Sequence, residues 1–155
     1  MAGKWKWHVP GGVQDYLPDE CYNKRKIEDK IRKSFFLNGY NEIQTPTLEF
    51  FDVFSQGKAS MEQEQMFKLF DPEGRILVLR PDITMPIARI VGTKLRDSLL
   101  PLRLSYFGNV YRYEEFQSCK QREVAQAGIE LVGVEKPEAD AEVIAIAIET
   151  FLDLG

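Results

Sequence analysis

The fold of this 155-residue chain is decided by a strand-like run at residues 102–113, whose sequence is LRLSYFGNVYRY. Its first residues alternate between apolar leucine or tyrosine and polar arginine or serine, and this period of two is typical of a strand. A polar stretch follows at 114–123, and a second strand-like run, VAQAGIELVGV, occupies 124–134. Two such runs around a polar loop predict a long hairpin.

Further elements are expected on both sides of this hairpin. A shorter hairpin is indicated where the apolar runs 66–70 and 75–79 flank the turn-forming tetrad Asp71-Pro72-Glu73-Gly74. The other expected elements are helices at 18–37, 47–54, 84–94 and from Pro137 onward, and a strand at 40–45. Because hairpins join most of the strands, the order predicts an α+β domain with an antiparallel sheet covered by helices.

The last helix is expected to be buried along a broad apolar face. The residues of this face are Val143, Ile144, Ala147, Ile148, Phe151 and Leu152. Their spacing of three and four positions places them on one side of a helix. The sequence therefore predicts that this helix packs into the core.

The composition is that of an ordinary globular protein, with 44% hydrophobic and 28% charged residues. These values exclude wholesale disorder and fit one domain spanning residues 1–155. The net charge of −4 disfavours a basic nucleic-acid binder. No apolar run is long enough for a membrane span or a signal peptide, so we expect a cytoplasmic protein.

A metal centre built from protein ligands is not expected. The chain has one histidine, His8, and two cysteines, Cys21 and Cys119, which stand 98 positions apart. This spacing matches neither a CxxC pair nor a zinc knuckle. A lone histidine near a terminus also argues against Ser-His-Asp and Cys-His catalysis.

Polar side chains gather where the expected strands end. They are Arg80, Asp82 and Thr84, then Arg112, Glu114, Lys120 and Arg122, then Gln126 and Glu130. Residues two or four positions apart on a strand share one face of the sheet. From spacing alone, surface ion pairs remain the better interpretation of these side chains.

Four ordered segments carry a family resemblance that extends over essentially the whole chain. They are PGGVQDYLP at 10–18, GYNEIQTP with Glu49 at 39–49, LRPDIT at 79–84, and the hairpin strands FGNVYRYE at 107–114 and QAGIELVG at 126–133. Together they resemble the histidyl-tRNA synthetase family, and the hairpin is similar to its motif 2. The resemblance implies a class II synthetase-like antiparallel sheet flanked by helices, present here as an incomplete, N-terminal portion.

Within this family the chain resembles the regulatory subunits of ATP phosphoribosyltransferase more than the true synthetases. Asp82 stands where synthetases usually have Glu, and TMPIAR at 84–89 is similar to the regulatory branch. The loop residues Phe116, Ser118, Cys119 and Glu123 depart from the synthetase pattern. The resemblance implies a non-catalytic subunit without a cofactor. It would join the short catalytic subunit in the first step of histidine biosynthesis and make it sensitive to L-histidine.

The resemblance also assigns site residues. It implies that L-histidine is bound by Asp82, Thr84, Arg112, Gln126 and Glu130. The carboxylates of Asp82 and Glu130 suit an α-ammonium group, and Arg112 suits a carboxylate or a phosphate. The resemblance also implies a vestigial nucleotide-binding role for Arg112, Glu114 and Lys120.

Two other interpretations stay open at the level of sequence. One is the N-terminal catalytic part of a histidyl-tRNA synthetase, which would activate histidine with ATP and magnesium. The other is a homodimerisation module without a ligand. In each case the resemblance implies a homodimer, with its two-fold axis near the helix at 24–37 and near Pro46; in the regulatory interpretation this dimer lies within a hetero-oligomer.

Overall fold

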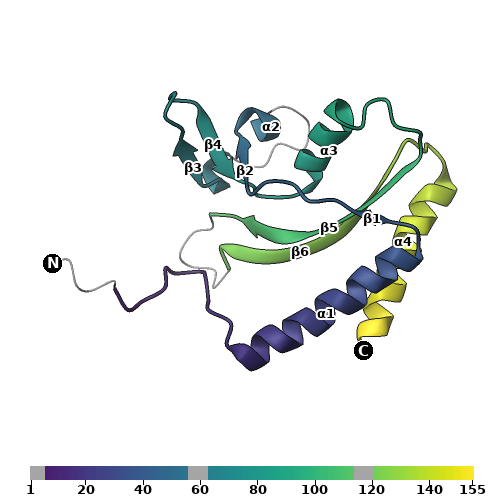
Figure 1. Cartoon of the computed structure of the whole chain (residues 1–155), viewed down its shortest axis with the longest axis horizontal. Coiled ribbons are helices and arrows are strands. Elements are labelled where there is room, and N and C mark those ends of the chain that lie inside the picture. The colour runs from purple at the N-terminus through teal and green to yellow at the C-terminus, as the bar shows by residue number, and fades with distance from the viewer. Residues whose placement is uncertain (1–5, 56–62, 114–120) are drawn as a thin grey trace. The chain divides into compact units, whose positions relative to one another are not determined.

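The computed structural model describes residues 6–55, 63–113 and 121–155, and Figure 1 shows its helices and strands. The chain divides into two compact units, each built from three segments. The first unit is formed by 1–15, 45–89 and 109–125, and the second unit by 16–44, 90–108 and 126–155. The assignment of residues 1–155 to one domain stays a prediction.

The first unit contains a three-stranded antiparallel sheet. Its strands are β2 (Leu48–Phe50), β4 (Ile76–Leu79) and β3 (Lys68–Phe70), in the order β2-β4-β3. The short helices are α2 (Asp52–Ser55) and the 3-10 turn η1 (Gln63–Gln65), and α3 (Thr84–Thr93) begins in this unit. Its core is the cluster of Phe54, Met66 and Val78.

The predicted hairpin between β3 and β4 is confirmed, and the turn chemistry explains it. The Oδ1 atom of Asp71 accepts hydrogen bonds from the backbone N–H groups of Glu73 at 3.0 Å and Arg75 at 2.8 Å. Gly74 closes the turn with φ of +80°, a conformation that glycine adopts without strain. The local sequence therefore determines this turn.

The helix predicted over residues 47–54 is wrong. Residues 48–50 form strand β2, and helix α2 begins only at Asp52. In β2 the side chain of Glu49 is buried between two exposed apolar neighbours, Leu48 and Phe50. This apolar run forms a strand because it pairs with β4, in the register Glu49↔Val78, and this pairing outweighs its local helical preference.

The second unit joins two helices and a mixed sheet. The helices are α1 (Pro18–Leu37) and α4 (Pro137–Leu154), and the strands are β1 (Asn41–Glu42), β5 (Leu102–Tyr111) and β6 (Glu123–Val132). The strand order is β1-β5-β6, and β1 pairs with β5 in parallel. The ends of β5 and β6 nearest their connection belong to the first unit. The α+β class is confirmed, but the expectation of one antiparallel sheet is corrected by this parallel pair and by the second sheet.

One face of β5 and β6 forms the core of the second unit with the two helices. Three residues are buried together: Phe35 of α1, Tyr40 just before β1, and Ile146 of α4. Phe107, Ile129 and Leu131 from the sheet, with Ile31 from α1, pack against them. Because side chains alternate along a strand, the neighbours of these residues point to the opposite face.

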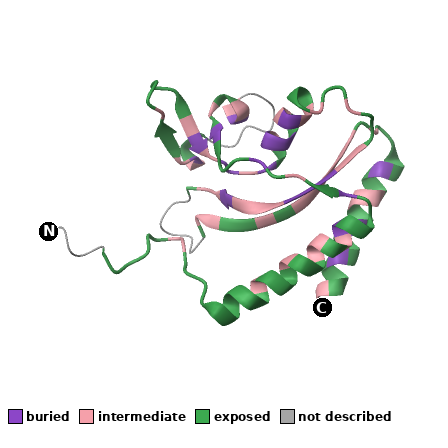
Figure 2. Cartoon of the chain, in the orientation of Figure 1, coloured by how far each residue is buried: buried purple, intermediate pink, exposed green. Residues whose placement is uncertain are grey.

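The buried face predicted for α4 is wrong. Ile144 and Ile148 are 60% and 54% exposed, and Phe151 and Leu152 are each 75% exposed. The buried residues of α4 are instead Ala139, Ile146 and Thr150. Figure 2 shows most of this helix as exposed or intermediate, with isolated buried bands. In the described ranges no helix combines the length and the apolar character that a membrane crossing needs.

Candidate functional site

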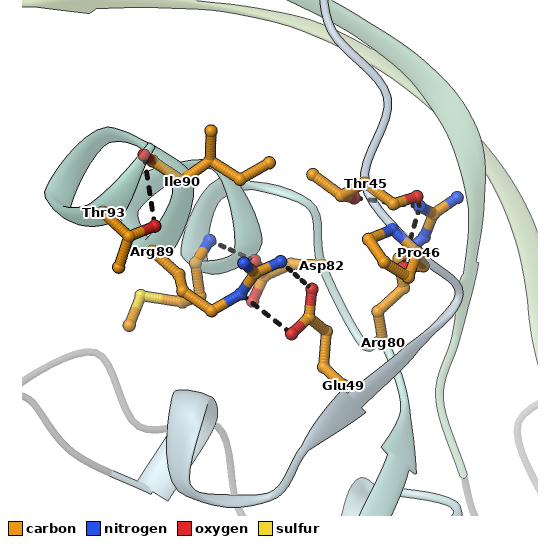
Figure 3. Close-up of polar contacts among 9 residues, drawn as sticks. Thr45, Pro46, Glu49, Arg80, Asp82, Arg89, Ile90 and Thr93 are labelled. Atoms are coloured by element: carbon orange, nitrogen blue, oxygen red, sulfur yellow. Dashed lines mark hydrogen bonds and ion pairs between the residues drawn. The ribbon is translucent and has the colours of Figure 1, made fainter. Parts of the chain in front are cut away.

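Arg80 lies at the end of β4 and organises the polar interior of the first unit. Its guanidinium donates to the backbone oxygen of Thr45 at 2.7 Å and to the Oγ1 atom of Thr45 at 3.0 Å. It also donates to the backbone oxygens of Pro46 at 3.3 Å and Asn109 at 2.9 Å (Figure 3 shows the contacts with residues 45 and 46). Burial lowers the pKa of Arg80. Arg80 is therefore a structural residue that ties three chain segments together.

Glu49 and Arg89 form a partly buried ion pair that fixes α3 against β2. The Nε atom of Arg89 lies 3.0 Å from one carboxylate oxygen of Glu49, and its Nη2 atom lies 2.5 Å from the other (Figure 3). The side chain of Glu49 is only 6% exposed. This two-point geometry sets the direction of the helix, because both partners have fixed planar groups.

Three of the sequence-predicted site residues meet at the beginning of α3. The Oδ1 atom of Asp82 accepts the backbone N–H of Met85 at 3.0 Å, so Asp82 caps the helix. Thr84 is the first residue of α3 and is exposed. The Nε atom of Arg112 donates to the backbone oxygen of Pro81 at 2.9 Å, which brings the guanidinium to this helix end. A carboxylate, a hydroxyl and a guanidinium thus gather within the first unit.

The backbone of Arg112 is held at the base of the connection between β5 and β6. Its N–H donates to the backbone oxygen of Arg122 at 2.9 Å, and the N–H of Arg122 donates to the backbone oxygen of Gly12 at 2.6 Å. The guanidinium of Arg122 lies 5.0 Å from the centre of the Tyr113 ring. The loop residues Glu114 and Lys120, which were assigned to nucleotide binding, lie outside the described residues.

Gln126 and Glu130, the other two predicted site residues, belong to the second unit. They lie four positions apart on β6 and are both partly buried. They share the sheet face opposite to Ile129 and Leu131, which pack against the helices. The shared face predicted from spacing is consistent with this arrangement. The site residues are thus distributed as Asp82, Thr84 and Arg112 in one unit and Gln126 and Glu130 in the other.

Sequence reasoning missed the role of Tyr106, which was read only as an apolar residue of a strand. The Nε2 atom of Gln126 donates to the Oη atom of Tyr106 at 3.5 Å. The signal was Gly128, since a glycine inside a strand often marks the close approach of another group. Within the ranges that the structure describes, no cluster of His, Cys, Asp and Glu is arranged to hold a metal ion.

Comparison with known sequences identifies relatives over nearly the whole chain. A family model described as histidyl-tRNA synthetase matches residues 12–155. The ATP phosphoribosyltransferase regulatory subunits of Acetivibrio thermocellus and Clostridium kluyveri are 56% and 46% identical over 152 and 151 residues. These matches cover 98% and 97% of this chain but only 36% and 39% of the relatives. The chain therefore spans less than two-fifths of the length of these curated relatives.

Solved structures agree with this assignment. A structure from Bacillus halodurans, titled an ATP phosphoribosyltransferase regulatory subunit/histidyl-tRNA synthetase, matches with a TM-score of 0.85 at 41% identity, over 97% of this chain and 38% of that chain. Apo histidyl-tRNA synthetase from S. aureus matches with a TM-score of 0.80 at 30% identity, over 96% of this chain and 35% of that chain. The class II synthetase-like fold is confirmed, and the chain belongs to the histidyl-tRNA synthetase family.

Proposed function

We propose that this chain acts in a regulatory subunit of ATP phosphoribosyltransferase. The observation that carries the proposal is the 46% to 56% identity to regulatory subunits over nearly all of its residues. The match to the S. aureus synthetase is lower, at 30% identity. Asp82 adds support, because it stands where synthetases usually have Glu, and here its shorter carboxylate caps α3.

The proposal makes this protein a non-catalytic partner in the first step of histidine biosynthesis. The short catalytic subunit would join ATP to phosphoribosyl pyrophosphate, and this chain would require no cofactor of its own. The protein would form a homodimer inside a cytoplasmic hetero-oligomer and would not bind nucleic acid. Its influence would be a coupling free energy, so that L-histidine and the partner each change the affinity for the other.

We propose further that Asp82, Thr84, Arg112, Gln126 and Glu130 bind L-histidine. Each group supplies part of what a free amino acid needs. Arg112 provides a cation for the carboxylate, and Glu130 provides an anion for the ammonium group. The side-chain amide oxygen of Gln126 is buried without a hydrogen-bond partner among the described residues, which suits a ligand that brings an N–H donor.

The second candidate function is histidine activation by a histidyl-tRNA synthetase. The observation behind it is the match to the S. aureus enzyme, with a TM-score of 0.80 at 30% identity, because one fold can serve both activities. The two functions separate in one pair of assays on the purified protein. Mixed with a short-form catalytic subunit, a regulatory subunit raises the rate of phosphoribosyl-ATP formation, and L-histidine lowers that rate. A synthetase instead gives histidine-dependent exchange of pyrophosphate with ATP.

The histidine site is tested by Glu130→Gln, which keeps the size of the side chain and removes its charge. Loss of one charge-assisted hydrogen bond should weaken histidine binding about ten- to a hundredfold in calorimetry. Glu135→Gln is the matched control, because Glu135 is an exposed residue five positions further along. Equal binding by the parent protein and Glu130→Gln would remove Glu130 from the site. Strong pyrophosphate exchange by the parent protein would replace the regulatory proposal with the synthetase.

A further inference from the structure

Tyr106 packs directly on the backbone of β6 at Gly128. A Cβ atom added to Gly128 would lie 2.4 Å from the Oη atom and 2.5 Å from the Cζ atom of Tyr106. Real Cβ atoms do not approach other heavy atoms so closely, so any larger residue at 128 must displace the ring. Tyr106 itself is only 6% exposed. The missing side chain at Gly128 therefore creates the space that the end of the phenol ring occupies.

This placement puts the phenol hydroxyl beside the amide of Gln126, two positions before Gly128 on the same face of β6. The Nε2 atom of Gln126 donates to the Oη atom of Tyr106 at 3.5 Å. The Oε1 atom of Gln126 is buried and has no hydrogen-bond partner among the described residues. Exchanging the two ends of the amide would put its nitrogen in that same buried position. In either orientation Tyr106 engages one end of the amide and the other end is left for a ligand.

We propose that Tyr106 is a positioning residue for the ligand, acting through Gln126. The hydroxyl fixes the rotation of the Gln126 amide so that its second polar atom points in one direction. With the oxygen in that position, the site selects a ligand that brings an N–H donor, as an ammonium group or an imidazole does. This inference rests on the proposed histidine site, and it deepens that proposal by naming a residue that controls its selectivity.

Leaving a buried carbonyl oxygen without a donor is unfavourable in the free protein. A ligand that supplies the donor removes this cost on binding, whereas a ligand without one leaves the oxygen unpaired. The packing of Tyr106 on Gly128 therefore sets the orientation of the Gln126 amide. That orientation determines which ligands the site binds well. Without the hydroxyl the amide can rotate, and the site loses part of that discrimination.

Tyr106→Phe tests the proposal because it keeps the ring on Gly128 and removes only the hydroxyl. In calorimetry with L-histidine we expect binding about three- to tenfold weaker than in the parent protein, the loss typical of one neutral hydrogen bond. In the Gln126→Ala background the same change should alter binding less than about twofold, because the residue through which the hydroxyl acts is gone. Equal losses in both backgrounds would show a general packing role and overturn the proposal.

Two further measurements separate the possible failures. The side-chain amide signal of Gln126 in nitrogen–proton spectra without ligand should shift in Tyr106→Phe, and an unchanged signal would overturn the proposal even if that variant is less stable. Gly128→Ala should weaken histidine binding, while Gly92→Ala, with open space around its Cβ position, should not. If the parent protein binds histidine and Tyr106→Phe binds equally well, only this inference fails. If the parent protein does not bind histidine, the proposed histidine site fails as well.

Discussion

Replacing Arg80 by methionine should strongly destabilise the first unit, because a methionine side chain cannot donate to the four acceptors around the guanidinium. Two of these acceptors belong to Thr45, which is 4% exposed, so water cannot replace the lost donors there. Each buried polar group left unsatisfied costs about 1–3 kcal/mol. The oxygens of Pro46 and Asn109 lie on less buried residues and can be rehydrated more easily. Removing the desolvated charge offsets part of the loss, so we expect about 3–5 kcal/mol.

Urea unfolding followed by circular dichroism measures this loss as a change in the free energy of unfolding. The matched control is Arg96→Met, since Arg96 is an exposed residue, and its effect should stay within about 0.5 kcal/mol. For a chain of this size the Arg80 substitution should also lower the melting temperature by roughly 6–20 °C. An Arg80→Met protein within about 1 kcal/mol of the parent would refute the view that Arg80 ties these segments together.

Two other predictions concern the folded state. Glu142 accepts from Arg103 and from the hydroxyl of Tyr40, and the hydrogen bond from Arg103 lowers the pKa of Glu142 below its usual value of 4.5. Its stabilising effect is thus present above pH 4.5 and lost on acidification, so the gap in melting temperature between the parent and Glu142→Gln should shrink below that pH. Gly12→Ala should cost about 1–3 kcal/mol, since Gly12 has φ of +83° and an added Cβ would lie 2.7 Å from the Cγ atom of Arg122. Gly11→Ala, with no atom near its Cβ position, should be close to neutral, and equal effects of the two glycine changes in thermal melts would contradict this geometry.

Elements with local signals could be predicted from the sequence. The β3–β4 turn follows from the side chain of Asp71 and the positive φ of Gly74, both of which act within four residues. Helix α1 begins at Pro18 and is followed by Gly39 with φ of +83°, as its capping residues indicated. In these places the residues that determine the structure are neighbours in the chain.

Two features that depend on distant partners could not be predicted. The apolar run at 47–54 predicts a helix, because the residues that make 48–50 a strand lie far away: β4 pairs with it, and Arg89, forty positions from Glu49, binds its buried carboxylate. Helix α4 carries more than one apolar stripe, and periodicity alone does not say that Ile146 faces Phe35 and Tyr40 while Ile148 is exposed. Tertiary packing makes both of these choices.

The same limit applies to the candidate site, where residue type alone did not separate structural from ligand-binding groups. Arg80 is a charged residue at a strand end like the candidate Asp82, yet its guanidinium already donates to three backbone oxygens and to the Oγ1 atom of Thr45. Gln126 differs from Arg80 because its amide is only half satisfied. A buried polar atom without a partner costs free energy in the empty protein, and a ligand that supplies the missing partner recovers it. The hydrogen-bond balance of each candidate is therefore a better guide to ligand binding than its charge, and by this measure the search for histidine contacts begins at Gln126.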